Sequence, residues 1–374
     1  MLSISPVQNY PIQKTKPNFR ANAPLTTYQH NHKKAEMQQK IMTGLQAGAL
    51  VAIIASVFLM LKSQGGMGMK KKELQELWQD VSNSAKLDEL ALPESLTNFT
   101  TKFKNAIKNP EVLLKRGGKP TKSVLLYGPP GTGKTTFAKA ITKEFPDARF
   151  AALDVTSLGS EYRSVSERNL NKAVDMICKE ADKNPNKKFF VFIDEIDSVM
   201  MVDNSTSAKH SNDLLNEFKK CFTEKLGKRD NIITIGATNL EINVEKGITA
   251  SGKKLDKAML DRFEDKVLVD LPTSEQILNS IKHHYKDKAM VCDALKTDSK
   301  ELKIISDFLS KKENNTSFRT LDSLYGSTAS SIQNTEKKVE IADFLRTIKS
   351  KQAELNFTDA EFEKLITDLG VKLN

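Results

Sequence analysis

The spacing of hydrophobic positions changes along the chain. Residues 43–61 are almost continuously apolar and contain no ionisable side chain. Apolar runs at 124–127 and 189–193 have the length typical of strands buried on both faces of a sheet. From about residue 273 onward, apolar residues recur at helical spacing to the end of the chain. The pattern therefore predicts an apolar N-terminal helix, an α/β region and a C-terminal helical region.

The apolar segment 43–61 has the length of a membrane-spanning helix. At about 1.5 Å per residue it would extend roughly 28 Å, close to the thickness of a bilayer's hydrocarbon core. A buried core helix would normally carry a polar stripe, whereas only Gln46 and Ser56 interrupt this segment. A signal peptide would not usually have about 40 residues before its apolar core. We therefore predict one transmembrane helix, and the lysines on both sides leave its orientation open.

The rest of the chain divides by composition and periodicity. Residues 1–40 are polar, rich in proline and basic, which predicts a disordered segment, with a transit peptide as the alternative. Residues 62–88 begin with KSQGGMGMKKK and are predicted to be a basic linker and the start of a helical region. We expect an α/β domain at 89–272, a helical subdomain at 273–350 and a helical tail at 351–374.

The net charge of +10 is concentrated before the α/β region. Residues 1–72 contain ten Lys and Arg against a single acid, Glu36, so they carry +9 of this charge. A domain that bound nucleic acid would be expected to carry the basic excess itself. We therefore expect no nucleic-acid partner.

Cysteine and histidine residues offer no metal site. Cys178, Cys221 and Cys292 stand far apart, which predicts free thiols in a reducing compartment. His283 and His284 are adjacent on a predicted helix, so they would point about 100° apart on a solvated face. The sequence contains no HExxH, the pattern of zinc proteases.

A glycine-rich loop follows the apolar run 124–127 and precedes a helical pattern. Its glycines let backbone N–H groups surround phosphate oxygens, and the helix N-terminus adds a positive dipole end. Lys134 is expected to contact the β- and γ-phosphates of ATP, and Thr135 to bind Mg²⁺. The predicted nucleotide-binding residues are Gly128, Pro129, Pro130, Gly131, Thr132, Gly133, Lys134, Thr135 and Thr136.

Two acids follow the second apolar run. Asp194 and Glu195 come directly after 189–193, at the carboxyl end of a predicted parallel strand, where doubly wound sheets bind ligands. Asp194 is suited to hold the hydrated Mg²⁺, and Glu195 is suited to polarise the water that attacks the γ-phosphorus. The alternative is a pair of surface acids after a core strand.

From about residue 92 to 344 the chain resembles the AAA family of P-loop ATPases. The motifs that carry the resemblance are LLYGPPGTGKTTFAKA, FIDEIDS, IITIGATN, LDKAMLDRF and TSFRTLDSL. The resemblance implies a doubly wound parallel sheet with a C-terminal helical lid, ATP hydrolysis with Mg²⁺, and assembly into a ring, expected to be a homohexamer. It also implies that Asn239 orients the lytic water, that Arg262 is an arginine finger reaching the neighbouring subunit's nucleotide, and that Arg319 is a second-sensor arginine.

Two features depart from the family pattern. Leu260 and Asp261 precede Arg262, where many members have a second arginine, and the stretch 240–254 is longer than usual. Both bear on the geometry between subunits rather than on nucleotide binding. The alternative for Arg262 is an ordinary surface salt bridge.

The loop around Tyr162 is similar to the pore loop of ring ATPases in this family. EYRSVSER carries an aromatic residue followed by a Ser-Glu pair, which predicts Tyr162 and Arg163 as pore-loop residues. An aromatic face can contact any extended peptide by apolar packing, largely regardless of its sequence. The alternative is a tyrosine packed on its own domain.

Together these features predict a membrane-anchored ATPase that extracts, translocates or remodels membrane-associated proteins. It would be single-pass, with the ATPase domain on the ATP-containing side of the membrane. The alternative is an ATP-switched scaffold or assembly chaperone that threads no polypeptide, and a nucleic-acid motor is a more distant third.

Overall fold

The computed structural model describes residues 77–154, 163–202, 209–333 and 336–373. The segments predicted at 1–40 and 43–61, and the pore-loop residue Tyr162, lie outside the described residues. Within the described ranges, no helix has both the length and the apolar character needed to cross a bilayer.

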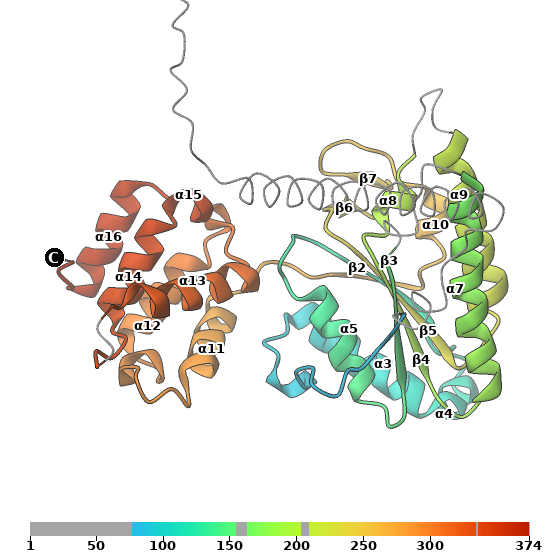
Figure 1. Cartoon of the computed structure of the whole chain (residues 1–374), viewed down its shortest axis with the longest axis horizontal. Coiled ribbons are helices and arrows are strands. Elements are labelled where there is room, and N and C mark those ends of the chain that lie inside the picture. Colours follow the sequence, from blue (N-terminus) through green and yellow to red (C-terminus); the bar gives the residue numbers. More distant parts are fainter. Residues whose placement is uncertain (1–76, 155–162, 203–208, 334–335, 374) are drawn as a thin grey trace, which may run out of the picture. The chain divides into compact units, whose positions relative to one another are not determined.

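A six-stranded sheet forms the centre of the α/β domain, in the strand order β1-β3-β4-β5-β2-β8 (Figure 1). All neighbouring strands run parallel except β1, which pairs antiparallel with β3 at the edge. The predicted α/β fold with a mostly parallel sheet is therefore confirmed. The strands are β1 (Trp78–Gln79), β2 (Ser123–Tyr127), β3 (Arg149–Asp154), β4 (Phe189–Asp194), β5 (Ile232–Thr238) and β8 (Asp265–Leu268).

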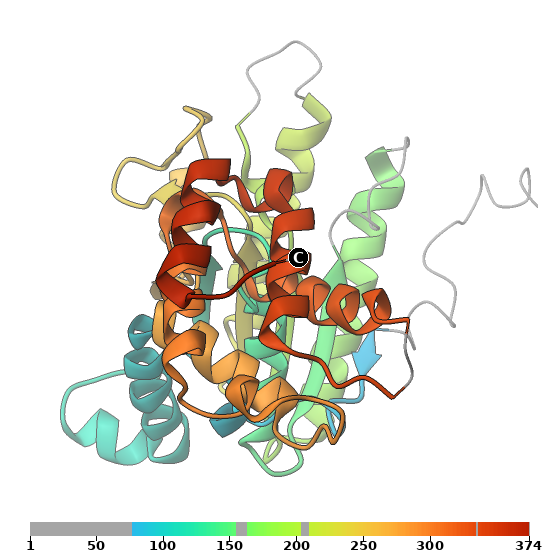
Figure 2. The same ribbon diagram turned by 90° about the vertical axis from the view of Figure 1, so that its left-hand side faces the viewer.

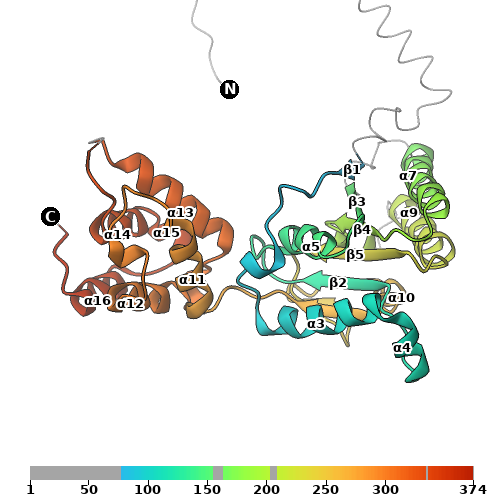
Figure 3. The same ribbon diagram turned by 90° about the horizontal axis from the view of Figure 1, so that it is seen from below.

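Helices cover both faces of the sheet, because side chains alternate in direction along each strand. Val124 and Leu126 of β2 belong to the hydrophobic cluster that contains residues of α3 and α5. Leu125, between them, belongs to the cluster formed with α7 and the helix after α9. Figure 3 shows α7 and α9 side by side, and the two helices are in contact. The four helices are α3 (Glu94–Lys108), α5 (Lys134–Lys143), α7 (Arg163–Lys183) and α9 (Lys209–Lys220).

Shorter elements connect these layers. A π-helix, Cys221–Leu226, continues directly from α9. The stretch 240–254, predicted to be unusually long, forms a small antiparallel hairpin of β6 and β7. The remaining short elements are a 3₁₀ turn (Leu87–Glu89), α4 (Pro110–Lys115), α8 (Asp197–Met200), β6 (Ile242–Asn243), β7 (Ile248–Thr249) and α10 (Lys257–Leu260).

The segment before the α/β domain differs from its prediction. Instead of starting a helical region, the described part of 62–88 contains strand β1 and a 3₁₀ turn, and the first α-helix begins at Glu94. Trp78 of β1 packs edge-on against Phe189 with ring centroids 5.8 Å apart, and the Arg149 guanidinium lies 4.2 Å from its ring. A two-residue strand has no periodicity to detect, so only tertiary contact defines it.

The C-terminal part is a helical subdomain with its own hydrophobic core (Figure 2). It starts at a capping box, in which Thr273 and Gln276 exchange side-chain and backbone hydrogen bonds. Its core also includes Phe357 and Phe362, so the helices predicted as a separate tail at 351–374 pack with the lid. The helices are α11 (Ser274–Tyr285), α12 (Lys300–Leu309), α13 (Phe318–Ser331), α14 (Ile341–Ser350), α15 (Gln352–Leu355) and α16 (Asp359–Leu369), with 3₁₀ turns at Asp293–Leu295 and Lys312–Asn314.

Candidate functional site

The glycine-rich loop leaves β2 and enters α5 through backbone conformations that favour glycine. Gly128, Gly131 and Gly133 have φ values of 137°, 76° and 90°. A Cβ at Gly128 would lie 2.4 Å from the Val269 carbonyl oxygen. A Cβ at Gly131 would lie 2.6 Å from Oγ of Ser317, a lid residue. The loop therefore depends on glycine both for its turn and for the close approach of two neighbouring segments.

Lys134, the first residue of α5, is buried inside this loop. Its Nζ donates hydrogen bonds to the carbonyl oxygens of Gly128 at 2.9 Å and Pro129 at 2.7 Å. Burial, opposed by Asp194 and assisted by the nearby Arg319, lowers the pKa of Lys134 to about 8. A phosphate group beside Lys134 would favour the charged ammonium, so the loop holds a cation that gains from an anionic ligand.

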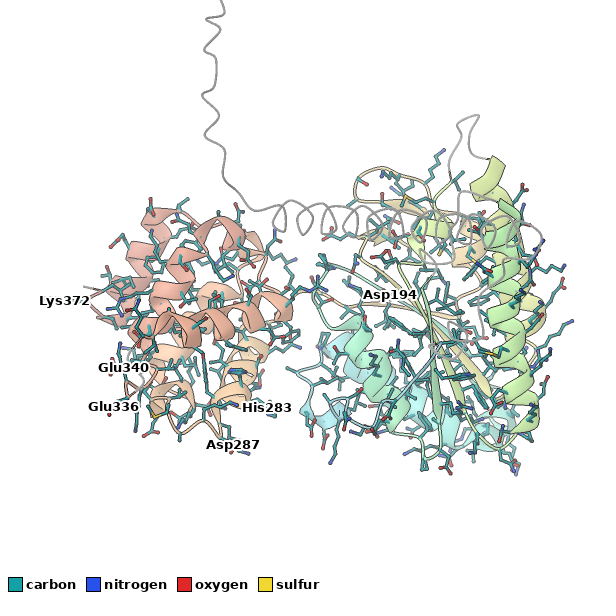
Figure 4. All side chains as sticks on the ribbon, viewed as in Figure 1. Asp194, His283, Asp287, Glu336, Glu340 and Lys372 are labelled. Atoms are coloured by element: carbon teal, nitrogen blue, oxygen red, sulfur yellow. The ribbon has the colours of Figure 1, made fainter. Side chains whose placement is uncertain are left out.

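Asp194 and Glu195 lie at the end of β4, next to the loop, where Figure 4 labels Asp194. The Thr135 hydroxyl donates to Oδ2 of Asp194 across 3.5 Å. The backbone N–H of Glu195 donates to Oδ1 of Asp194 at 3.0 Å. Glu195 has a φ of 47°, a left-handed conformation that is uncommon for a residue other than glycine. This strained turn presents an exposed carboxylate at the edge where the loop lies.

The residues predicted to hold Mg²⁺ fit that ion. Mg²⁺ usually takes one or two protein oxygens together with phosphate oxygens and waters. The Thr135 hydroxyl and the Asp194 carboxylate form such a pair beside the phosphate-binding loop. No group of three or more His, Cys, Asp or Glu side chains suited to a metal occurs among the residues that the structure describes. The donor set therefore matches Mg²⁺ carried by ATP.

Asn239 follows β5, the strand between β4 and β2. Its side chain is exposed and lines a cavity of about 530 Å³ together with Pro129 and Pro130 of the loop. Asp270 and Lys312 line the same cavity. Strand order thus brings Asn239 beside the phosphate-binding loop, and its role in orienting water stays a prediction.

Arg319 reaches the loop from the lid. It lies in the first turn of α13, and its backbone N–H donates to the Gly131 carbonyl at 3.3 Å. Ser317 caps the same helix by accepting a hydrogen bond from the Thr320 N–H. The Arg319 side chain is exposed and close enough to lower the pKa of Lys134. The structure therefore brings Arg319 to the predicted phosphate site.

A second cavity of about 530 Å³ adjoins the loop and was not predicted from the sequence. It has a loop-side wall from Thr132, Gly133 and Thr136, a wall from residues 88–93, and a wall from lid helices α11 and α13. Its position directly beside the phosphate-binding loop suits the base and ribose of a nucleotide. Its walls come from segments about 190 residues apart, so no short motif predicts it.

His283 and His284 belong to this cavity, and Figure 4 labels His283 on α11. Both side chains are exposed, as predicted, but they line the cavity rather than an open face. The His284 ring stacks on Tyr325 with centroids 4.1 Å apart, and this partial burial lowers the pKa of His284. The Tyr325 hydroxyl hydrogen-bonds Ser280 at 3.1 Å.

Arg262 lies at the opposite end of β2 from the loop. Ser123, the first residue of β2, donates its hydroxyl to the Arg262 carbonyl at 2.9 Å. Because β2 has five residues, about 13 Å separates its amino end, beside Arg262, from its carboxyl end, where the loop begins. The guanidinium donates from Nε to Oγ1 of Thr223 at 2.8 Å and from Nη1 to the Ala258 carbonyl. Among the described residues Arg262 forms no salt bridge, so the alternative interpretation of Arg262 as a surface salt bridge is not supported.

The pore-loop prediction concerns Tyr162, outside the described residues, and Arg163, which is described only as the first residue of α7. The longer stretch 240–254 packs beside α8: the Val202 N–H donates to the Lys254 carbonyl at 3.0 Å, and Asp256 N–H to Met200 at 2.8 Å. The hairpin is thus anchored at its base to the segment that follows β4.

Comparison with known proteins is consistent with this geometry. The family described as "ATPase family associated with various cellular activities (AAA)" matches residues 124–271. A cell division cycle protein 48 homolog of Archaeoglobus fulgidus is 26% identical over 235 residues, which are 63% of this chain and 29% of that protein. An ATP-dependent zinc metalloprotease FtsH 2 of Salinibacter ruber is 26% identical over 262 residues, 68% of this chain and 35% of that protein.

A third relative is the proteasome-activating nucleotidase of Methanoregula boonei, 32% identical over 207 residues. The match covers 53% of this chain and 42% of that protein. The chain thus spans less than half the length of each of these relatives.

Proposed function

We propose that this chain hydrolyses ATP within a ring of identical subunits, because residues 124–271 match the family of AAA ATPases. The work done with that energy is proposed to be the extraction, translocation or remodelling of membrane-associated proteins. Each ATP would bind to one subunit through the loop that contains Lys134, and the next subunit would complete the site with Arg262.

The position of Arg262 carries the proposal of a ring. The Arg262 carbonyl accepts from Ser123 at the amino end of β2, whereas Lys134 and Glu195 lie at the carboxyl end of the sheet. A charged arginine held away from its own phosphate loop can serve the loop of a neighbour. Such a head-to-tail contact is heterologous, and it generates a ring when its repeated rotation closes.

The membrane role is supported by the sequence rather than by the described structure. The uncharged segment 43–61 and the basic residues around it suit a bilayer anchor. We propose that this anchor brings the ring to its substrates. The relative from Salinibacter ruber is named a zinc metalloprotease, but this sequence has no HExxH, so proteolysis is not part of the proposal.

Complementation between two inactive variants tests the ring. Arg262→Ala should lose about 10³-fold in turnover while it keeps its affinity for ATP. Lys134→Ala should lose ATP binding but still present an intact Arg262. Mixed rings of the two should recover part of the activity, since some interfaces then pair an intact loop with an intact arginine. The measurement is phosphate release against the mixing ratio.

Two controls make this experiment decisive. Native mass spectrometry must show that both variants occupy the same rings, and specific activity of the unmodified chain should rise with its concentration. A complete lack of recovery in rings shown to be mixed would contradict trans action by Arg262.

Threading of a substrate is tested at Tyr162. Tyr162→Ala should keep ATP turnover within about twofold but abolish ATP-driven extraction of a model membrane protein from liposomes. Tyr162→Phe should preserve extraction, because the ring face rather than the hydroxyl makes the contact. Normal extraction by Tyr162→Ala at an unchanged melting temperature would instead favour an ATP-switched scaffold.

A further inference from the structure

We propose that Thr223 is a positioning residue for Arg262, holding the guanidinium where it can serve the neighbouring subunit. This inference rests on the proposed trans-acting role of Arg262. Thr223 lies in the π-helix, 39 residues before Arg262 in the sequence, and belongs to none of the motifs described above. The direct contact is the 2.8 Å hydrogen bond from Arg262 Nε to Thr223 Oγ1.

The two acceptors define the direction of the guanidinium plane. Nε donates to the Thr223 hydroxyl and Nη1 to the Ala258 carbonyl one turn earlier in the chain. The fork of an arginine is planar and rigid, so two such bonds fix its orientation. Nη2 donates to no acceptor among the described residues. One edge of the cation is therefore left for an external anion.

The neutrality of both acceptors is the second observation. A carboxylate partner would offset the charge of Arg262 and reduce what it can offer to a phosphate. A hydroxyl and a carbonyl orient the guanidinium but leave its full charge in place. Neutral acceptors suit an arginine that stabilises negative charge on another molecule. An arginine with only a structural role on the surface would not need them.

The π-helix determines where Thr223 lies. The Gly227 N–H donates to the Phe222 carbonyl at 2.9 Å, five residues earlier, which is the hydrogen bond of a π turn. The π turn continues from α9, which Figure 1 labels, and keeps Phe222 buried while Thr223 is exposed. π turns are rare and occur often at functional sites.

An aromatic contact beneath the surface aligns the two residues. Phe222 and Phe263, the immediate neighbours of Thr223 and Arg262, are both buried and pack edge-to-face with centroids 5.0 Å apart. This arrangement is favourable for aromatic pairs. Because the two aromatic residues meet inside, the residues beside them meet outside. The position of Thr223 relative to Arg262 is thus set by the core and not by a flexible loop.

Removal of the hydroxyl is the direct test. Thr223→Val keeps the shape of the side chain but not the acceptor, and we expect it to lower kcat for ATP roughly tenfold, since the bond involves a charged donor. The dissociation constant for ATP and the amount of assembled ring should not change. Thr223→Ser should restore turnover to near that of the unmodified chain.

Controls separate positioning from folding. Thr367→Val, on the exposed face of α16, makes the same chemical change at a helical threonine and should leave kcat unchanged. Thr223→Ala is a second variant with a higher helix propensity, which guards against loss of folding by valine. Thr223→Val and Thr223→Ala should both melt within a few degrees of the unmodified chain, because Thr223 is exposed and no cavity forms.

A double variant distinguishes the outcomes. In the Arg262→Ala background, Thr223→Val should cause no further loss of kcat, because the hydroxyl acts only through the guanidinium. A further loss there, or full turnover by Thr223→Val and Thr223→Ala alone, would overturn the inference while leaving the role of Arg262 standing. Full turnover by Arg262→Ala itself would remove the proposed finger, and the positioning role with it.

A pair of isosteric variants tests the role of neutrality. Thr223→Asn offers a neutral acceptor, and Thr223→Asp offers a charged one of nearly the same shape. If the full charge of Arg262 matters, the aspartate variant should be the slower of the two. Equal or faster turnover by the aspartate variant would contradict the argument from neutral acceptors.

Discussion

The two ends of the central sheet are built in different ways. At the carboxyl ends, the glycine-rich loop and the acidic pair are two short continuous stretches: Gly128 to Thr136, and Asp194 with Glu195. At the amino ends, Arg262 is held by Thr223 and by a backbone carbonyl, and no short stretch contains both side chains. We propose that the first end binds the nucleotide of its own chain and that the second serves a neighbouring chain.

This difference predicts how amino-acid substitutions at each end should affect ATP binding and turnover. Around Lys134, the buried ammonium is held by two carbonyls of its own loop, so we expect substitutions of the motif residues to remove binding or chemistry outright. Around Arg262, orientation depends on Phe263 and the sheet beneath it, so substitutions far from any phosphate can lower turnover without affecting ATP affinity. The predictions below test this contrast.

The largest effects should come from the nucleotide end. Lys134→Ala should abolish ATP binding, because the phosphates lose the buried ammonium. Glu195→Gln should bind ATP but lose at least about 10²-fold in turnover, since an amide cannot polarise the attacking water. Filter binding and phosphate release separate the two effects. Near-normal turnover by Glu195→Gln would refute its assignment as the lytic carboxylate.

A substitution inside β5 should disturb the core beneath Arg262. A Cβ at Gly236 would lie 2.8 Å from Cζ of Phe263 and 3.2 Å from Cδ1 of Ile196, so Gly236→Ala should chiefly displace Phe263, the residue beside Arg262. We expect a loss of about 1–3 kcal/mol in the free energy of unfolding, as for other overpacked cores. Turnover should fall while ATP affinity in the folded protein is retained, as measured by melting curves and phosphate release.

Gly326→Ala is the matched control. Gly326 lies in α13, and no atom lies within 4 Å of a Cβ placed there. Alanine should therefore stabilise the helix by about 1 kcal/mol and leave turnover unchanged. Adding Phe263→Leu to Gly236→Ala should recover part of the lost stability by making room. Unaltered melting of Gly236→Ala would mean that Phe263 can shift freely and does not fix this end.

The smallest expected effect is a pH dependence of ATP binding. The pKa of Lys134 is lowered to about 8 in the free protein, and a bound phosphate would raise it. Binding therefore takes up a proton when the pH is above about 8, and the affinity should fall by at most about tenfold per pH unit. Calorimetry in buffers of different ionisation enthalpy measures this uptake. Proton release, or no uptake at pH 9, would contradict the assignment.

The nucleotide end was predictable because its physical requirements are local. A loop that surrounds phosphate needs glycine at Gly128, Gly131 and Gly133, and a buried parallel strand needs a continuous apolar run. Each of these requirements selects residue types that lie within a few positions of each other in the sequence. The α/β fold, the helical subdomain and the positions of Lys134, Asp194 and Glu195 could therefore be predicted from the sequence.

Local pattern was less informative where an element owes its form to distant contacts. The sequence predicted a helical start before residue 89, but Trp78 joins the sheet because it can pack against Phe189. The sequence also predicted a separate C-terminal tail, but Phe357 of that segment packs on Phe308 of the lid core with ring centroids 5.2 Å apart. In both cases the local sequence pattern did not distinguish the two outcomes, and packing of an aromatic ring decided between them.

The sequence by itself thus determined the chemistry at the nucleotide end, since that chemistry depends on residue types at fixed short spacing. Only the tertiary structure decided that His284 and Tyr325 line the cavity beside the loop and that Thr223 contacts Arg262. These groups are brought together by strand order and core packing. Such packing depends on the summed burial of many side chains, so no single short stretch of sequence contains it.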